Sequence, residues 1–239
     1  MTDTSHKDTN GIRIPFIGEP APAFTAETTN GTIDFPGDYK GKWVILFSHP
    51  ADFTPVCTTE FMTLASMQPE FDELNAKLIG LSVDSSYSHI AWLRTIKERI
   101  KYRGMENVEV RFPVIADVNK EVAAKYGMIH PEVSDTYPVR SMFIIDPEGR
   151  IKATLIYPQP TGRNFQELKR MLIACQTAAV HQVATPADWQ PGDDVIVPPP
   201  DQYGLARQRT EKTVEALRCE DWFLCFKTLG DSGDRRAGI

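Results

Sequence analysis

Residues 43–60 read WVILFSHPADFTPVCTTE and place a cysteine, Cys57, shortly after a continuous apolar run. The run Trp43–Phe47 is short and follows turn residues, which is typical of a strand that is buried in a parallel sheet. Helically spaced apolar residues follow from Thr58 to Asn75, where Pro69 is expected to kink or split the helix. The pattern therefore predicts a strand, a loop and a helix, with Cys57 at the beginning of the helix.

Strand and helix patterns alternate along the next part of the chain. Asn30-Gly31 predicts a hairpin turn between two short strands. Further strands are predicted at 78–83, 112–116, 141–145 and 151–157, and helices at 86–100, 121–126 and 164–183. In the helix at 86–100, Ile90, Leu93, Ile96 and Ile100 are expected on the buried side. This alternation predicts a three-layer α/β domain with a mixed sheet.

The composition of the sequence changes after residue 185, where a polar stretch contains several prolines. We predict a flexible N-terminus at 1–13, a main domain at 14–185 and a smaller unit at 186–239 with a short helix at 210–217. The smaller unit is too short and proline-rich to bury much core by itself. It is therefore expected to pack on the main domain or on another subunit.

Charge and composition exclude several classes of protein. The 239 residues include 26 Lys and Arg and 32 Asp and Glu, for a net charge of −6, so a global basic footprint for nucleic acid is absent. The longest apolar run is far shorter than the ~20 residues that span a bilayer, and the polar N-terminus does not resemble a signal peptide. We expect a cytoplasmic protein that binds neither nucleic acid nor membrane.

Four cysteines are too few for a structural disulfide framework, so we consider whether any of them is reactive. The N-terminus of a helix is the positive end of its dipole and favours the thiolate of Cys57, which is the nucleophile toward peroxides and disulfides. Pro50 and Pro55 are expected to fix the loop and shield the sulfur, and Thr54 to place a hydroxyl beside it. The alternative is a buried, inert thiol.

The loop from His49 to Glu60 resembles the peroxidatic loop of peroxiredoxins, whose pattern of Pro, three residues, Thr or Ser, two residues and Cys is matched by Pro50, Thr54 and Cys57. The block is similar to the one-cysteine, peroxiredoxin-6 subfamily. This resemblance implies a thioredoxin-like fold with a small C-terminal dimerisation domain. It also implies a thiol peroxidase that reduces hydrogen peroxide and organic hydroperoxides through a Cys57 sulfenic acid, without metal, haem or flavin.

Two later segments extend the resemblance. Residues 138–147 are similar to the family segment whose arginine holds the thiolate and polarises the peroxide, which gives this role to Arg140. Residues 157–165 resemble the second arginine segment of the subfamily and point to Arg163.

Two residues near Cys57 are open to more than one interpretation. Glu60 lies one helical turn after Cys57 and either pairs with one of the arginines or is an ordinary first-turn acid. His49 either contacts the sulfur or its oxidised forms, or caps the loop.

The C-terminal cysteines, Cys219 and Cys225, do not form a Cys-x-x-Cys motif, and a zinc half-site would lack a second pair of ligands. Their spacing, with Asp221-Trp222 between them, resembles an archaeal-type branch of the subfamily. That resemblance implies that Cys225 resolves the sulfenic acid of a neighbouring subunit, with Cys219 as an auxiliary or alternative partner. The alternative is a packed pair in an aromatic cluster. Cys175 is predicted to be a core residue.

The resemblance further implies a thioredoxin-like dithiol reductant and a homodimer that assembles into a decamer. Two other functions stay open. One is a protein thiol–disulfide oxidoreductase, which the absence of Cys-x-x-Cys disfavours. The other is a peroxide sensor or redox-switched, chaperone-like oligomer that uses Cys57. Some one-cysteine peroxiredoxins are described as phospholipases that use a serine just before the tryptophan of the first core strand. Here Tyr39–Lys42, which precede Trp43, contain no serine, so lipase activity is not expected.

Overall fold

The computed structural model describes residues 13–211 and 217–230, and the chain divides into two compact units, residues 1–165 and 166–239. This division gives most of the long helix after residue 165 to the second unit, whereas the sequence-based prediction placed that helix in the main domain. The predicted boundary after residue 185 stays a prediction, and the predicted flexible N-terminus lies almost entirely outside the described residues. In the described part of the chain, no helix is both long enough and apolar enough to cross a membrane.

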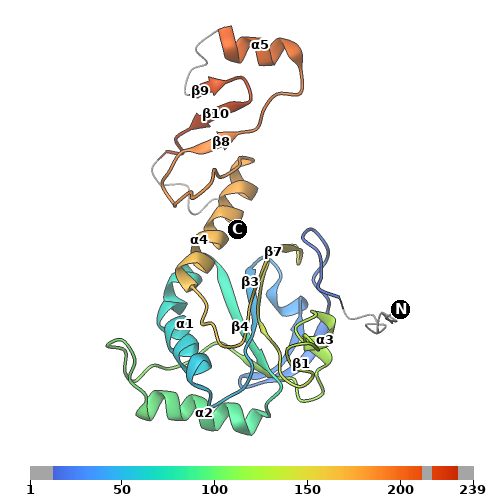
Figure 1. Cartoon of the computed structure of the whole chain (residues 1–239), viewed down its shortest axis with the longest axis vertical. Helices are drawn as coiled ribbons and strands as arrows, with labels where there is room; N and C mark the ends of the chain where they lie inside the picture. The colour runs from blue at the N-terminus through green and yellow to red at the C-terminus, as the bar shows by residue number, and fades with distance from the viewer. Residues whose placement is uncertain (1–12, 212–216, 231–239) are drawn as a thin grey trace, which may run out of the picture. The chain divides into compact units, whose positions relative to one another are not determined.

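The first unit is built on a seven-stranded mixed sheet in the order β2-β1-β5-β4-β3-β6-β7 (Figure 1). Strands β3, β4 and β5 are parallel to one another, and the other pairings are antiparallel. The predicted mixed α/β architecture is therefore confirmed. The strands are β1 Phe24–Thr28, β2 Gly31–Phe35, β3 Trp43–Ser48, β4 Ala76–Ser82, β5 Val114–Ala116, β6 Arg140–Ile145 and β7 Ile151–Tyr157.

Helices flank this sheet: α1 Pro55–Glu73, α2 Ser86–Arg99 and α3 Glu121–Lys125, together with a 3-10 turn at Gly37–Tyr39. Strand β3 lies at the centre, and all six of its residues are buried. Leu46 belongs to the core cluster that also contains Val122 of α3 and Phe143 of β6. Phe47 packs against Phe61 of α1, with 5.6 Å between ring centroids. Because both faces of the strand are covered, its sequence is continuously apolar.

Helix α1 begins three residues earlier than predicted and runs unbroken through Pro69, so the helix is not split there. The alternative, a kink at Pro69, stays a prediction. Proline at the first helical position is favourable, because its missing N–H would have had no partner there. Met67 and Phe71, on either side of Pro69, are buried. Their packing holds the helix together where one backbone hydrogen bond is lost.

The position of α1 against the sheet depends on Gly80 in β4. A Cβ atom at this residue would lie 3.3 Å from the rings of both Phe47 and Phe61. The missing side chain therefore lets α1 approach the sheet closely, which holds the first turn of the helix beside the end of β3.

The buried face of α2 differs in part from the prediction, which is correct for Ile96. His89, Trp92 and Ile96 are buried, whereas Ile90 is 55% exposed. The indole Nε1 of Trp92 donates to the hydroxyl of Thr58 at 3.2 Å. Polar contacts of His89 and Trp92 with the neighbouring loop and helix have thus set the rotation of α2, and a purely apolar periodicity does not contain this information.

The second unit contains α4 Phe165–His181, α5 Tyr203–Glu211 and a three-stranded sheet in the order β8-β10-β9. The strands are β8 Val195–Val197, β9 Arg218–Asp221 and β10 Leu224–Lys227. Its small apolar cluster contains Ala174, Val183, Trp189 and Val195. Most of the helix predicted at 210–217 lies outside the described residues, and α5 precedes it.

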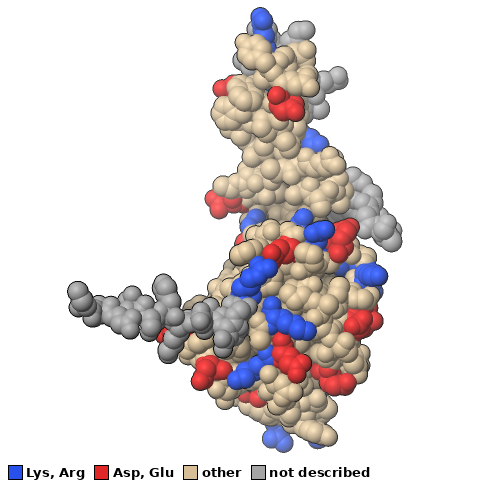
Figure 2. Space-filling view, turned by 90° about the vertical axis from the view of Figure 1, so that its right-hand side faces the viewer, with Lys and Arg blue, Asp and Glu red and all other residues tan. Residues whose placement is uncertain are grey.

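On the face of the first unit seen in Figure 2, acidic and basic side chains are interspersed. The described residues also include exposed ion pairs such as Arg94–Glu98 and Lys97–Glu109. Isolated exposed pairs contribute little to stability. The buried ion pairs of Glu60 with Arg140 and Arg163 are therefore the electrostatic interactions that matter more for the fold.

Candidate active site

Cys57 is the third residue of α1 and is completely buried. Thr54 caps the helix in an extended conformation, and the first helical hydrogen bond runs from the Thr58 N–H to the Thr54 carbonyl at 3.0 Å. The N–H groups of Val56 and Cys57 therefore precede the intrahelical hydrogen bonds. The sulfur thus lies at the positive end of the helix dipole, where the sequence pattern places it.

Arg140, the first residue of β6, reaches the sulfur. Its Nη1 lies 3.3 Å from Sγ of Cys57 and 2.8 Å from Oε2 of Glu60. Its Nε donates to the carbonyl of Gln159 at 2.7 Å. Because β6 pairs with β3, the sheet itself brings Arg140 to the end of β3, next to the loop that carries Cys57.

Arg163 binds Glu60 rather than the sulfur. Its Nε and its backbone N–H donate to Oε1 of Glu60 at 3.0 and 2.9 Å, and its Nη2 donates to Oε2 at 2.7 Å. Its Nη1 donates to the carbonyls of Ser48 and Ser141 at 2.9 and 3.2 Å. Arg163 thus fastens Glu60 to the ends of β3 and β6, and the predicted pairing of Glu60 with the arginines is found for both of them.

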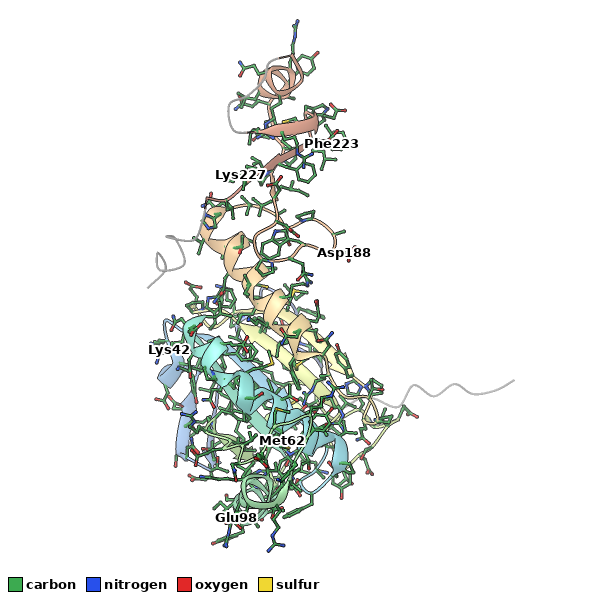
Figure 3. All side chains as sticks on the ribbon, turned by 90° about the vertical axis from the view of Figure 1, so that its left-hand side faces the viewer. Lys42, Met62, Glu98, Asp188, Phe223 and Lys227 are labelled. Atoms are coloured by element: carbon green, nitrogen blue, oxygen red, sulfur yellow. A yellow bond between two sulfur atoms is a disulfide. The ribbon has the colours of Figure 1, made fainter. Side chains whose placement is uncertain are left out.

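The electrostatics of Glu60 follow from these two arginines. Burial by itself would raise the pKa of the Glu60 carboxyl, but the charges and hydrogen bonds of Arg163 and the charge of Arg140 outweigh it and hold the pKa below its usual value. Glu60 is therefore ionised. Figure 3 labels Met62 on the stretch of α1 that follows Glu60.

The loop before the helix is held by its own hydrogen bonds. The hydroxyl of Thr54 donates to the Ala51 carbonyl at 2.8 Å, and the hydroxyl of Thr58 donates to the Thr54 carbonyl at 2.8 Å. Pro50 is buried. The Thr54 hydroxyl is thus engaged within the loop, and a role for it at a bound peroxide stays a prediction.

His49 is completely buried, and its Nε2 lies 3.1 Å from Oδ1 of Asp52. The same carboxylate contacts Nδ1 of His89 on α2 at 2.9 Å. Sequence reasoning missed both Asp52 and His89. The spacing of three residues between His49 and Asp52 was a usable signal, but His89 is 37 residues from Asp52 and nothing local marks it.

This cluster is also a place where described residues could hold a metal ion, because ligand atoms of His49, Asp52 and Asp84 lie within 4.8 Å of one another. These atoms already have partners. The Asp52 carboxylate contacts two imidazoles, and the Asp84 carboxylate accepts from the Asp52 N–H and the Ser82 hydroxyl at 2.9 and 2.7 Å. Apart from Nδ1 of His49, these polar atoms are satisfied within the cluster, which fits a polar cluster better than a metal site.

The C-terminal cysteines lie in the second unit and are joined to each other. Cys219 on β9 and Cys225 on β10 face one another in the strand pairing, with Cα atoms 4.0 Å apart, and form a disulfide. Cys225 is completely buried, and Cys175 on α4 is half-buried. In Figure 3 the labels Phe223 and Lys227 mark the two sides of Cys225 along the chain.

Comparison with known proteins identifies the family of the chain. Residues 17–154 match the model of the AhpC/TSA family, and residues 174–213 match the C-terminal domain of 1-Cys peroxiredoxin. A peroxiredoxin of Methanosarcina mazei is 61% identical over 90% of this chain and 98% of its own length. A peroxiredoxin of Aquifex aeolicus is 51% identical over 91% of this chain and 99% of its own.

Solved structures show the same fold. A yeast mitochondrial 1-Cys peroxiredoxin, studied for thiol resolution by glutathione and thioredoxin systems, has a TM-score of 0.76 and 39% identity, covering 90% of this chain and all of its own. Peroxiredoxin 6 of Arenicola marina, solved as a cysteine-to-serine mutant, has a TM-score of 0.76 and 35% identity, covering 91% and 99% of the two chains. The first unit therefore has the thioredoxin-like fold of these proteins, and the chain belongs to the peroxiredoxin family.

Proposed function

We propose that this peroxidase uses Cys57 as its nucleophile and reduces hydrogen peroxide and organic hydroperoxides to water and alcohols. The observation that carries the proposal is the 3.3 Å contact between the Arg140 guanidinium and the Cys57 sulfur inside a buried site. A guanidinium only donates hydrogen bonds. Its preferred partner is therefore an anion, and the sulfur at this position supplies one as the thiolate.

The charges around the sulfur support the same state. Arg140 and Arg163 are both buried and share the single carboxylate of Glu60. Buried charges are costly unless they are paired. Among the described residues of this cluster, a Cys57 thiolate would supply the second negative charge, so that two cations face two anions.

In the proposed reaction the thiolate attacks one peroxide oxygen in line with the O–O bond. The S–O bond forms as the O–O bond breaks, and the leaving oxygen takes a proton from solvent to become water or an alcohol. Cys57 is oxidised to a sulfenic acid and the peroxide is reduced. Arg140 stabilises the negative charge that develops on the oxygens, and Thr54 and Pro50 shape the entrance and orient the peroxide.

Glu60 and Arg163 serve the reaction through Arg140. Glu60 accepts from Nη1 of Arg140 at 2.8 Å, while Arg163 holds Glu60 through three hydrogen bonds. A planar guanidinium that is fixed in this way needs little reorganisation when the peroxide arrives. His49 is assigned to the same site as a residue that contacts the oxidised sulfur.

For the second half of the cycle we propose that Cys225 of a neighbouring subunit resolves the sulfenic acid. The Cys225 thiol attacks the sulfenic sulfur, water leaves, and a Cys57–Cys225 disulfide forms. Cys219 then attacks the Cys225 sulfur, which releases the Cys57 thiolate and forms the Cys219–Cys225 disulfide. The pairing of these two cysteines in the second unit supports this step, because it corresponds to the final oxidised product.

An external dithiol of the thioredoxin kind would then reduce the Cys219–Cys225 disulfide. Thiol resolution in the yeast mitochondrial relative proceeds via glutathione and thioredoxin systems, which supports a thiol donor of this type. We further propose a homodimer, since the resolving step requires a neighbouring subunit. In line with the family resemblance, we propose that the dimers assemble into a decamer, and that the protein is cytoplasmic.

The test of the proposed function is steady-state peroxide consumption by the full-length protein with dithiothreitol as reductant. Cys57→Ser is expected to abolish turnover, whereas Cys175→Ser, which changes a cysteine on α4, is expected to retain it. Turnover that survives in Cys57→Ser would overturn the proposal.

A further inference from the structure

A second buried polar cluster lies beside the first turn of α1. It consists of His49, which follows β3, Asp52 in the loop, and His89 on α2. His49 and His89 are completely buried, and Asp52 is 6% exposed. The proposed peroxide chemistry uses neither Asp52 nor His89.

The hydrogen bonds of His89 define its protonation. Its Nδ1 lies 3.0 and 2.9 Å from the two carboxylate oxygens of Asp52, and its Nε2 lies 3.1 Å from the carbonyl oxygen of Ile115. A carbonyl oxygen only accepts hydrogen bonds, and so does an ionised carboxylate. Both ring nitrogens must then donate, and His89 is an imidazolium ion.

Asp52 is the matching anion. Burial by itself would raise the pKa of its carboxyl, but hydrogen bonds and charge from His49 and His89 outweigh it and lower the pKa. The backbone N–H of Asp52 donates to the carboxylate of Asp84, which holds the loop in place. His89 and Asp52 thus form a buried ion pair in which each charge has its partner.

His49 contacts the same carboxylate but carries no charge. Its Nε2 faces Oδ1 of Asp52 and must donate, so Nδ1 is left with a lone pair. Burial lowers the pKa of His49 despite the raising effect of Asp52, and the positive charges of His89 and Arg163 lower it further. Nδ1 is buried and has no hydrogen-bond partner among the described residues.

The ring of His49 is also held in orientation. It stacks on Trp92, with 5.1 Å between centroids, and meets the edge of Phe61 at 4.7 Å. Phe61 follows Cys57 by one turn of α1, and the Nε1 of Trp92 donates to Thr58, the residue next to Cys57. The rings that fix His49 are therefore those that pack around the first turn of α1.

We propose that His89 is a positioning residue for the peroxide reaction, because its positive charge satisfies Asp52 and so keeps His49 neutral, with hydrogen on Nε2 and a lone pair on Nδ1. This lone pair accepts a hydrogen bond from a hydroxyl group formed or bound at the sulfur. The inference rests on the proposed function for its link to peroxide.

The alternative state shows why His89 is needed. Without a positive charge at His89, the buried carboxylate of Asp52 would face only His49. A second proton on His49 would then restore the charge balance, and Nδ1 would become a donor. Two further charged groups of the described chain are near the pair: Asp84 accepts from the Asp52 N–H, and Arg163 lowers the pKa of His49. Neither donates a hydrogen bond to the Asp52 carboxylate, so His89 decides which nitrogen of His49 carries hydrogen.

The direct test is nuclear magnetic resonance of the ring nitrogens in full-length, reduced protein at neutral pH, with the five histidines labelled with nitrogen-15. Each signal is assigned by its loss in the His→Gln variant. We expect hydrogen on both nitrogens of His89 and on Nε2 alone of His49. A single protonated nitrogen in His89, or hydrogen on Nδ1 of His49, would overturn the assignment. The same spectra can be recorded in Cys57→Ser, which is expected to have no turnover. The outcome of this measurement is therefore distinguishable from a failure of the proposed function.

The positioning role is tested with His89→Gln, which keeps a hydrogen-bond donor but removes the charge. We expect His49 to gain hydrogen on Nδ1. Loss of a group that orients an imidazole costs about 10- to 100-fold at metal sites, and we expect a fall of this order in the rate of Cys57 oxidation by hydrogen peroxide. An unchanged rate with folded protein would overturn the role.

Two further variants complete the design. His130→Gln changes a half-buried histidine outside the cluster and is expected to leave the His49 signals and the rate unchanged. If His89→Gln fails to fold, Asp52→Asn tests the same ion pair from the other side. Removal of the carboxylate is expected to leave His89 with one protonated ring nitrogen, and an imidazolium that persists in Asp52→Asn would contradict the proposal.

Discussion

The Nη1 atom of Arg140 lies 3.3 Å from the sulfur of Cys57, although the two residues are 83 positions apart in the chain. The contact exists because β6 pairs with β3, and the loop that carries Cys57 leaves the end of β3. The same nitrogen donates to Glu60 at 2.8 Å. One guanidinium therefore links the Cys57 sulfur to a carboxylate that a second arginine holds.

This geometry predicts that Arg140→Lys impairs peroxide reduction even though the positive charge is kept. A lysine ammonium cannot reproduce the planar guanidinium, whose Nη1 contacts the sulfur and Glu60 while its Nε donates to the carbonyl of Gln159. By analogy with the loss of one charge-stabilising donor, we expect the rate of Cys57 oxidation to fall about 100- to 1,000-fold. Stopped-flow measurement of a single turnover with hydrogen peroxide gives this rate. The exposed Arg94→Lys is the control, and equal rates in the two variants would contradict the prediction.

Glu60→Gln is expected to destabilise the fold. The substitution leaves two buried guanidinium groups without their shared carboxylate, and breaking a buried ion pair by removing one partner typically costs about 3–5 kcal/mol. Urea unfolding of the reduced protein measures the loss. Glu98→Gln removes an exposed partner of Arg94 and should have a negligible effect. Similar stabilities of the two variants would show that Glu60 is not needed to balance the arginines.

Much of this site could be predicted because its signals are local. The apolar run of β3, the prolines of the loop and the position of Cys57 at the start of α1 all lie within residues 43–60. The segments around Arg140 and Arg163 were identified by their resemblance to a family. That route succeeds when neighbouring residues carry the pattern, although the functional contact itself is long-range.

The parts that could not be predicted depend on packing between distant elements. Pro69 is tolerated inside α1 because Met67 and Phe71 anchor the helix, and no rule about proline in isolation contains that. His89 is buried in place of Ile90 because Asp52 and the carbonyl of Ile115 bind its ring. A periodicity that counts only apolar residues treats a histidine as exposed. The prediction therefore placed Ile90 on the buried face of α2 and left His89 out.

The pKa of His49 predicts how stability depends on pH. Burial lowers the folded-state pKa of His49 below its unfolded value of about 6.5. The unfolded chain then binds a proton that the folded protein does not, so stability is present above about pH 6.5 and is lost as the pH falls below it. Among the charged neighbours, Asp52 raises the pKa of His49, whereas His89 and Arg163 lower it in the same direction as burial.

The carboxylates Asp52 and Glu60 add a second loss at lower pH, because their folded-state pKa values are also lowered. Their contribution is present above their unfolded values of about 4 and is lost as the pH falls through that range. Urea unfolding of wild type and His49→Gln at several pH values between about pH 7.5 and about pH 5 isolates the contribution of His49 to the pH dependence of stability. Wild type should lose more stability than the variant over this range, and parallel curves would contradict the prediction.

The disulfide of the second unit leads to a prediction about trapped intermediates. In the proposed cycle, Cys225 first forms a disulfide with Cys57 of another subunit, and Cys219 then breaks that bond. Cys219→Ser removes the second nucleophile, so the disulfide between subunits should accumulate after one equivalent of hydrogen peroxide. A non-reducing gel should show a dimer-sized band in this variant, whereas wild type should end mainly at the monomer, with Cys219 joined to Cys225.

Three controls make this result specific. The dimer-sized band of Cys219→Ser should disappear when Cys225→Ser or Cys57→Ser is added to it, because either change removes one of the two sulfurs. In Cys175→Ser the outcome should match wild type. A dimer-sized band that persists in Cys219→Ser/Cys225→Ser would show that another thiol resolves Cys57. If Cys219→Ser instead stops at the sulfenic acid in intact mass measurements, with Cys225 unreacted, then Cys225 does not resolve Cys57. The Cys219–Cys225 disulfide is in that case a structural crosslink.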